Sequence, residues 1–449
     1  MSDADTPRDG RPRLPRARWL VLGFVLVFIA AWAPIFFSDG DPPEDADLRI
    51  APAAPIPPEE NSAAAWLAAP RFDSPPPGSS WSWQDDLPLD APEPSTAERA
   101  RLDRERTWIT TNRRALEARA AALELSGFAP DSSRGMPHDL LASLEGFERA
   151  AAYAVATGEW SDAWRWTEVG AAWHRRWFDH PLPAFPFLLT NRKTTIAITR
   201  LRIAQLMPEQ PFLLEAALAT TERSELPEGW RQRLIRRNYM AYFDMVGADD
   251  ARWATLMARK LPPPGWAKTF HRPHRAQRLF ADLTRATIDA LDRGVTGTFA
   301  IEEELEAFPD LDNPLTRLVH FATGNAGGIY LARHYTYMPN ALVDANRVAT
   351  IEFATAATRT LLALRIHRAR HGSWPASLDD LIPDVIDALP IDPASPNRAP
   401  LSYDRERGVI WGVGENGIDD GGVIGAEQRG RIIVEGDDRV VPLSYPGRE

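Results

Sequence analysis

Apolar residues recur at helical spacing through most of the chain. Between residues 98 and 125 they stand at Leu102, Trp108, Leu116 and Leu123, and the segment opens on Ser95-Thr96-Ala97-Glu98, which has the pattern of a capping box. The same period predicts helices at 138–157, 160–178, 190–206, 211–224, 228–246, 249–259, 273–292, 299–307 and 347–371. Gly and Pro separate most of them. We therefore expect an α-helical domain over residues 98–344.

One predicted helix pair has the pattern of a tight hairpin. Gly158 stands between two helical stretches in which Ala and Trp alternate at positions suited to close antiparallel packing. The turn resembles those of tetratricopeptide-like hairpins, but no regular repeat follows, so we expect an irregular helical-hairpin bundle. The Trp residues have two readings, core packing or a ligand platform, and helical spacing favours packing. They stand at Trp160, Trp164, Trp173 and Trp177.

The last eighty or so residues change character. A long helix is expected to end at Gly372, and a short one to begin after Ser377. Four strand-like runs follow, separated by stretches rich in Gly and Asp: Leu401–Asp404, Val409–Val413, Arg431–Val434 and Arg439–Leu443. The predicted fold is therefore mainly α, with a small α+β domain over residues 345–449 that contains a short antiparallel sheet.

The N-terminus has the pattern of a membrane anchor. Residues 19–37 read WLVLGFVLVFIAAWAPIFF, without a charge, and are long enough for one helical crossing of a bilayer. Five arginines lie in residues 1–18, which predicts a cytoplasmic N-terminus and an extracytoplasmic bulk. A cleaved signal peptide is the alternative, with Ala31-Trp32-Ala33 as its site, but Pro34 would follow the cut. We expect a single-pass protein of the inner membrane.

Residues 38–97 are rich in proline and predict a semi-rigid, extended linker. Trp66, Trp81 and Trp83 interrupt the prolines, so parts of the linker are candidates for docking onto the folded body. Ser62 to Ala69 has the composition of one or two helical turns.

The composition and the motifs that are missing exclude several classes of function. The 449 residues have a formal net charge of −11, which argues against a nucleic-acid binder, and contain no Cys, which excludes disulfides and thiolate metal sites. No G-x-S-x-G, P-loop or H-E-x-x-H motif is present; Arg368 stands between His367 and His371 where a zinc protease needs Glu. An enzyme with scattered catalytic residues, such as an extracytoplasmic hydrolase, stays open as an alternative.

The stretch GVGENGIDDGG at 412–422 is the main candidate for chemistry. Gly412, Gly414 and Gly417 fit the dinucleotide fingerprint, but that site needs a following helix, which the next glycines oppose. A calcium site suits the acidic residues better, because calcium takes six to eight oxygen ligands from carboxylates and carbonyls. The candidate ligands are Glu415, Asn416, Asp419, Asp420, Asp437 and Asp438. A pair of solvated turns is the competing interpretation.

The tail resembles the C-terminal region of the major pseudopilins of type II secretion over about residues 345–440. The motifs are His371-Gly372-Ser373-Trp374-Pro375, then Leu389-Pro390-Ile391-Asp392-Pro393, then Leu401-Ser402-Tyr403. Because major pseudopilins bind calcium in the corresponding loop, the resemblance implies a structural calcium ion here. A pseudopilin also has a Gly-Phe processing site followed by Glu; after Gly23-Phe24 this chain has Phe28 in that place, and residues 38–344 separate anchor from tail.

The whole layout resembles a group of uncharacterised, membrane-anchored bacterial proteins typical of planctomycetes, a likeness that implies no activity. From the anchor, the hairpins and the missing catalytic motifs we expect a non-enzymatic scaffold or interaction protein of the envelope, with an envelope protein as its partner. A secretion-apparatus component is a further alternative.

Overall fold

The computed structural model describes Val27 and residues 39–50, 56–57, 59–73, 95–128, 138–179, 186–223, 229–246, 265–269, 271–292, 313, 325–331, 338–414, 417–422, 433–434 and 438–444. The predicted anchor at 19–37, apart from Val27, and the predicted helices at 249–259 and 299–307 lie outside these residues. Within the described ranges, every helix is too short or too polar to cross a bilayer.

The chain forms two compact units. Unit 1 contains Met1–Glu44, Val246–Leu279 and Pro309–Ala332, and unit 2 contains Asp45–Met245, Phe280–Phe308 and Arg333–Glu449. Unit 1 has the short helices α10 (Gly265–Thr269) and α14 (Ala326–Leu331), and α11 (Pro273–Asp292) begins in unit 1 and ends in unit 2.

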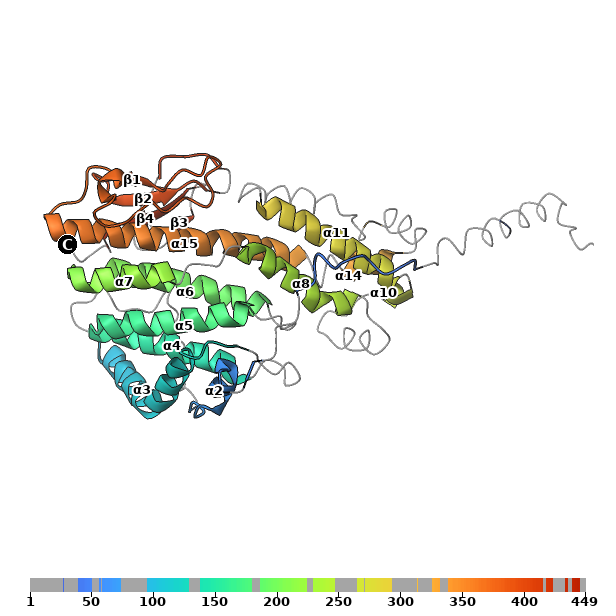
Figure 1. Cartoon of the computed structure of the whole chain (residues 1–449), viewed down its shortest axis with the longest axis horizontal. Helices are drawn as coiled ribbons and strands as arrows, with labels where there is room; N and C mark the ends of the chain where they lie inside the picture. Colours follow the sequence, from blue (N-terminus) through green and yellow to red (C-terminus); the bar gives the residue numbers. More distant parts are fainter. Residues whose placement is uncertain are drawn as a thin grey trace, which may run out of the picture. The chain divides into compact units, whose positions relative to one another are not determined.

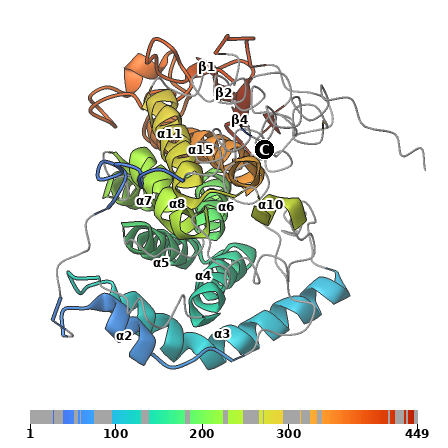
Figure 2. The same cartoon turned by 90° about the vertical axis from the view of Figure 1, so that its right-hand side faces the viewer.

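Unit 2 is a stack of helices with a small sheet on its last helix (Figures 1 and 2). Its helices are α2 (Ser62–Ala68), α3 (Thr96–Ala122), α4 (His138–Thr157), α5 (Trp160–Asp179), α6 (Pro186–Leu206), α7 (Pro211–Arg223), α8 (Trp230–Val246) and α15 (Met338–His371). Successive helices pack on one another from α3 to α6, and α15 covers both α6 and α7. The predicted helices within the described residues are confirmed; most ends shift by four residues or fewer, whereas α15 begins nine residues before the predicted start at 347.

Local signals set several helix ends. The Ser95 side chain accepts from the backbone N–H of Glu98 while the Glu98 carboxylate accepts from that of Ser95, so the predicted capping box is present. At the hairpin between α4 and α5, Gly158 has a φ of +76°, and the N–H of Glu159 donates to the carbonyl of Ala154. Ala151 and Ala163 are fully buried in that pair, which confirms the close packing predicted from small residues.

The helix α15 joins the helical stack to the tail. Its buried residues point both toward α6 and α7 and toward β2 and the short 3₁₀ helix η3 (Leu378–Leu381). Leu361, Leu362, Ala363, Leu364 and Ile366 have no exposed surface, as expected of a helix covered on all sides. The predicted domain border at residue 345 falls inside α15, and one hydrophobic core continues across it into the tail.

The tail contains the predicted antiparallel sheet. Its strands are β1 (Ser402–Asp404), β2 (Val409–Gly412), β3 (Ile433–Val434) and β4 (Arg439–Pro442), in the order β1-β2-β4-β3. Ile410 pairs with Val441, and both are buried against the core that α15 shares. The structure confirms the predicted runs 401–404, 409–413 and 439–443, and of the run 431–434 it describes and confirms Ile433-Val434. The helix end at Gly372 and the turn of helix after Ser377 are confirmed as well.

Part of the predicted linker is folded onto the helical stack. Residues 59–73 include α2, in which Asn61 caps the first turn by accepting from the N–H of Ala63. Trp66 is 1% exposed and lies edge-on to Trp173 of α5, with ring centroids 4.0 Å apart. The Arg119 guanidinium of α3 donates to the carbonyl of Pro70 at 2.6 Å.

Candidate functional site

The described part of the Gly/Asp loop is closed by its own side chains. The Asp419 carboxylate accepts from the indole N–H of Trp411 at 2.8 Å and from the N–H of Gly421 at 2.9 Å. These hydrogen bonds, with Trp411 the largest contributor, lower the pKa of Asp419. The loop therefore uses Asp419 to fasten itself to strand β2.

Arg407 binds two backbone carbonyls of the loop. Arg407 donates to the carbonyl oxygens of Gly421 at 2.7 Å and Gly422 at 2.8 Å, and its guanidinium lies 5.0 Å from the centre of the Trp411 ring. Residues 417–422 are not helical, and Gly417, Gly421 and Gly422 all have positive φ. The dinucleotide interpretation has no support in this geometry, because the fingerprint needs a helix N-terminus at this point.

Behind the loop lies a buried acidic pair. Asp392 is 3% exposed and accepts from the N–H groups of Ala394 at 3.0 Å and Val413 at 2.8 Å. Asp438 is 2% exposed; its Oδ2 accepts from the N–H of Gly422 at 2.8 Å, and its Oδ1 has no hydrogen-bond donor among the described residues. Burial raises the pKa of Asp392; the charge of Asp438 also raises it, while Arg439 opposes both.

The structure brings together only some of the predicted ligands. Asp419 and Asp438 lie at the loop, Asp420 is exposed, and Glu415, Asn416 and Asp437 lie outside the described residues. Among the described residues no group of three or more His, Asp or Glu side chains is arranged to hold a metal. Asp392 was missed by the sequence reasoning, although it stands in one of the motifs that carry the pseudopilin resemblance.

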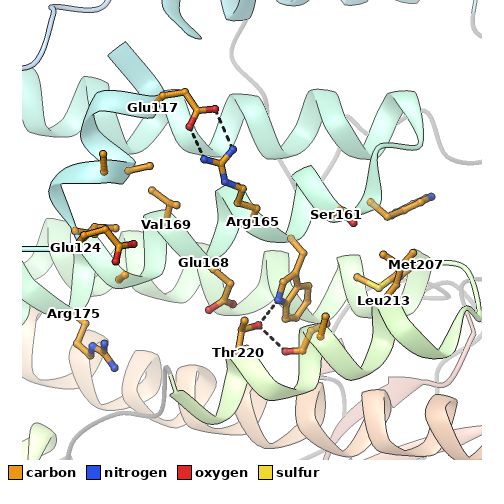
Figure 3. A pocket seen from close by; sticks show the side chains of 18 residues that line it. Glu117, Glu124, Ser161, Arg165, Glu168, Val169, Arg175, Met207, Leu213 and Thr220 are labelled. Carbon is orange, nitrogen blue, oxygen red and sulfur yellow. Dashed lines mark hydrogen bonds and ion pairs between the residues drawn. The ribbon is translucent and has the colours of Figure 1, made fainter. Parts of the chain in front are cut away.

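A second candidate site is a groove on the helical stack. Its volume is about 680 Å³, and it lies between α3, α5 and α7, which are alternate helices of the chain. Figure 3 shows the side chains that face it. The lining contains Trp160, Trp164, Val169, Met207, Leu213 and Ala216 among its apolar members.

The charged groups of the groove are largely paired within the protein. Arg165 of α5 reaches Glu117 of α3 with two hydrogen bonds, as Figure 3 shows, and this pairing lowers the pKa of Glu117. Glu168 pairs with Arg200 of α6 at 2.7 Å. Arg165 favours the ionised form of Glu117, and an ionised carboxylate is a poor general acid.

The predicted Trp stripe divides between core and groove. Trp173 is fully buried and donates its indole N–H to the carbonyl of Arg119, which confirms packing at this position. Trp164 is 6% exposed and donates to the Thr220 hydroxyl at 2.6 Å, while its ring forms part of the groove wall. Trp160 is half-buried and lines the groove, and the Trp177 side chain lies outside the description.

A further cleft of about 710 Å³ lies beside the groove, and Trp160 and Met207 line both. Its other walls come from the end of α6, from α15 and from the tail, including Arg368 and Trp374. The Arg368 guanidinium lies 4.7 Å from the centre of the Trp374 ring. Both clefts lie within unit 2.

Comparisons of the chain with protein-family models, with curated proteins and with solved structures gave no match in any of the three. The interpretation of the groove and the loop therefore depends on their geometry.

Proposed function

We propose that the protein is a single-pass, membrane-anchored envelope protein that acts as a non-enzymatic interaction protein. Its partner is a protein segment with an apolar, uncharged face, which binds in the groove between α3, α5 and α7. The supporting observation is the groove itself: aromatic and aliphatic side chains form its walls, and the charges at Glu117 and Glu168 are already paired by arginines. An apolar helix face laid into such a groove buries area without leaving these charges unpaired.

Photo-crosslinking from inside the groove tests this proposal. Ser161 is exposed and lines the groove, so a photoreactive phenylalanine analogue there should crosslink to one discrete partner in native membranes. Ala216→Trp fills the groove from an exposed position and should reduce the crosslink at least fivefold, or by about 1 kcal/mol of binding free energy.

The matched control is Ala100→Trp, which adds the same side chain at an exposed position of α3 outside the groove. This variant should leave the crosslink unchanged. A crosslink that survives Ala216→Trp, or no discrete product from Ser161, would contradict a partner site in the groove.

We further propose a structural calcium ion at the tail loop. The observation that favours it is the buried Oδ1 of Asp438, which lacks a donor among the described residues and lies in the field of a second buried acid, Asp392. A buried anionic oxygen without a partner is costly, and a divalent cation would offset that cost. Of the predicted ligands, Asp438 fits this role, whereas Asp419 is committed to closing the loop.

The substitution Asp438→Asn separates the calcium site from simple turns. In calcium, the wild type should be stabilised by about 2.7 kcal/mol at a hundredfold excess over Kd, and the variant should lose this gain. In chelator, the variant should instead be about 1 kcal/mol more stable than the wild type, because a neutral amide replaces a buried carboxylate whose Oδ1 has no donor among the described residues. Thermal unfolding in the two buffers measures both.

Glu406→Gln is the control, since Glu406 is an exposed acid of the same tail. It should follow the wild type in both buffers. If calcium leaves the unfolding of the wild type unchanged, the loop is a pair of turns fastened by Asp419 and Arg407.

A further inference from the structure

The first described residues after the predicted membrane helix are fixed to the start of α11. Asp39 lies two residues beyond Phe37, the last residue of the predicted span. Its carboxylate accepts from the backbone N–H groups of His274 at 3.0 Å and Arg275 at 3.2 Å, in the first turn of α11. A distant acid thus caps this helix, where N–H groups lack partners and negative charge is favoured.

Further contacts hold the same short segment. Arg278 of α11 donates to the backbone carbonyls of Asp39 and Asp41, and Nδ1 of His274 lies 2.8 Å from the carbonyl oxygen of Gly40. Gly40 has a φ of +71°, and a Cβ there would lie 2.6 Å from Nη2 of Arg278. Residues 39–41 are therefore held closely against α11 within unit 1.

This attachment limits how far α11 can lie from the end of the span. Two residues of extended chain reach about 7 Å at most, so the Cα atom of Asp39 lies no farther than that from the Cα atom of Phe37. The headgroup layer on each side of the hydrocarbon core is about 5–7 Å thick. If residues 19–37 cross a bilayer, the first turn of α11 lies at the level of the lipid headgroups.

The neighbouring residues have the composition of such an interface. Trp266 of α10 lies edge-on to Tyr330 of α14, with ring centroids 5.5 Å apart, and both are half-buried. Arg272 and Arg275 flank Pro273 at the start of α11 and are also partly exposed. Trp, Tyr and Arg are the residues that place an apolar stem or ring in the acyl boundary and a polar end in the headgroups.

We propose that the described part of unit 1 is seated on the bilayer, with α10 and the first turn of α11 in the headgroup layer and with Trp266, Arg272 and Arg275 in contact with lipid. The occupant of this surface is the membrane that the anchor crosses, so the inference rests on the proposed membrane span. Asp41 and Glu44 lie on the same segment and offset part of the arginine charge, so aromatic contacts contribute alongside attraction to anionic lipid.

The absence of cysteine from the chain allows a direct test. The full-length protein with Thr269→Cys, an exposed position of α10, is labelled with an environment-sensitive dye and reconstituted in vesicles of phosphatidylcholine and phosphatidylglycerol. A nitroxide on the lipid headgroup should quench the dye. Adding Trp266→Ser and Arg275→Glu should lower this quenching at least twofold while circular dichroism stays unchanged.

Extraction of the same vesicles with alkaline carbonate separates this inference from the proposed span. Protein that stays in the membrane while Thr269→Cys shows no headgroup quenching would overturn the seated unit and leave the anchor intact. Release of the protein by carbonate would overturn both. If the double substitution disturbs folding, Arg275→Glu alone is added to Thr269→Cys. Headgroup quenching at low salt equal to that of the Thr269→Cys protein would then overturn the lipid contact of Arg275.

Discussion

Arg149→Met should lower the free energy of unfolding by about 3–5 kcal/mol, one of the two largest effects that we expect from a single substitution. Arg149 of α4 donates through Nη1 to both carboxylate oxygens of Glu105 on α3, at 2.9 and 3.1 Å. The Glu105 side chain is fully buried and that of Arg149 is 4% exposed. Removing the guanidinium takes the ion pair away from a buried carboxylate, and it also breaks the pair between Arg149 and Glu145.

Two variants control for the loss of packing and for ion pairing in general. The double variant Glu105→Gln with Arg149→Met removes both charges and should recover most of the lost stability. Arg165→Met breaks the half-exposed pair with Glu117 and should cost no more than about 1 kcal/mol. Urea unfolding followed by far-UV circular dichroism measures the free energy of unfolding of the three variants. If that of Arg149→Met lies within about 1 kcal/mol of the wild type, the pair is not essential to the packing of α3 on α4.

The parts of the fold that sequence predicted are those set by neighbours along the chain. Burial of one face gives the apolar residues of a helix their regular spacing, so this spacing predicted most of the helices. Gly158 marked the hairpin because its backbone needs a positive φ. The strands of the tail were found because alternation and Gly/Asp turns are local as well. In α15 the same pattern predicted a start at 347, nine residues after Met338, because composition there gives no sharp boundary.

The candidate sites depend on contacts that no local pattern records. Arg407 closes the loop because it lies opposite Gly421 and Gly422, and Asp392 joins the site by accepting from the N–H of Val413. The groove forms because α3, α5 and α7 each contribute one face to its wall. Of its lining residues, the sequence pattern singled out only the Trp residues. Proline composition predicted a spacer, and it was Trp66 and the helical composition of residues 62–69 that marked the part of it that packs on the stack; α2 and the buried Trp66 confirm both predictions.

That docking leads to the second large effect, expected for Trp66→Ala. The indole of Trp66 is 1% exposed, meets Trp173 edge-on at 4.0 Å between centroids, and also contacts Phe147, whose ring centroid lies 6.1 Å away. Replacing a buried Trp with Ala removes its transfer free energy and leaves a cavity, which together cost about 3–5 kcal/mol. Urea unfolding should therefore report a clear loss, although Trp66 lies in the proline-rich segment.

Leu67→Ala is the matched control, because Leu67 is the next residue of the same helix and is 43% exposed. This substitution changes the helix propensity of α2 little, and it should lower the free energy of unfolding by less than about 1 kcal/mol. If residues 59–73 were only a spacer, both substitutions would be equally mild, since no core would lose a side chain. A large loss for Trp66→Ala with a small one for Leu67→Ala would instead place α2 in the cooperative core.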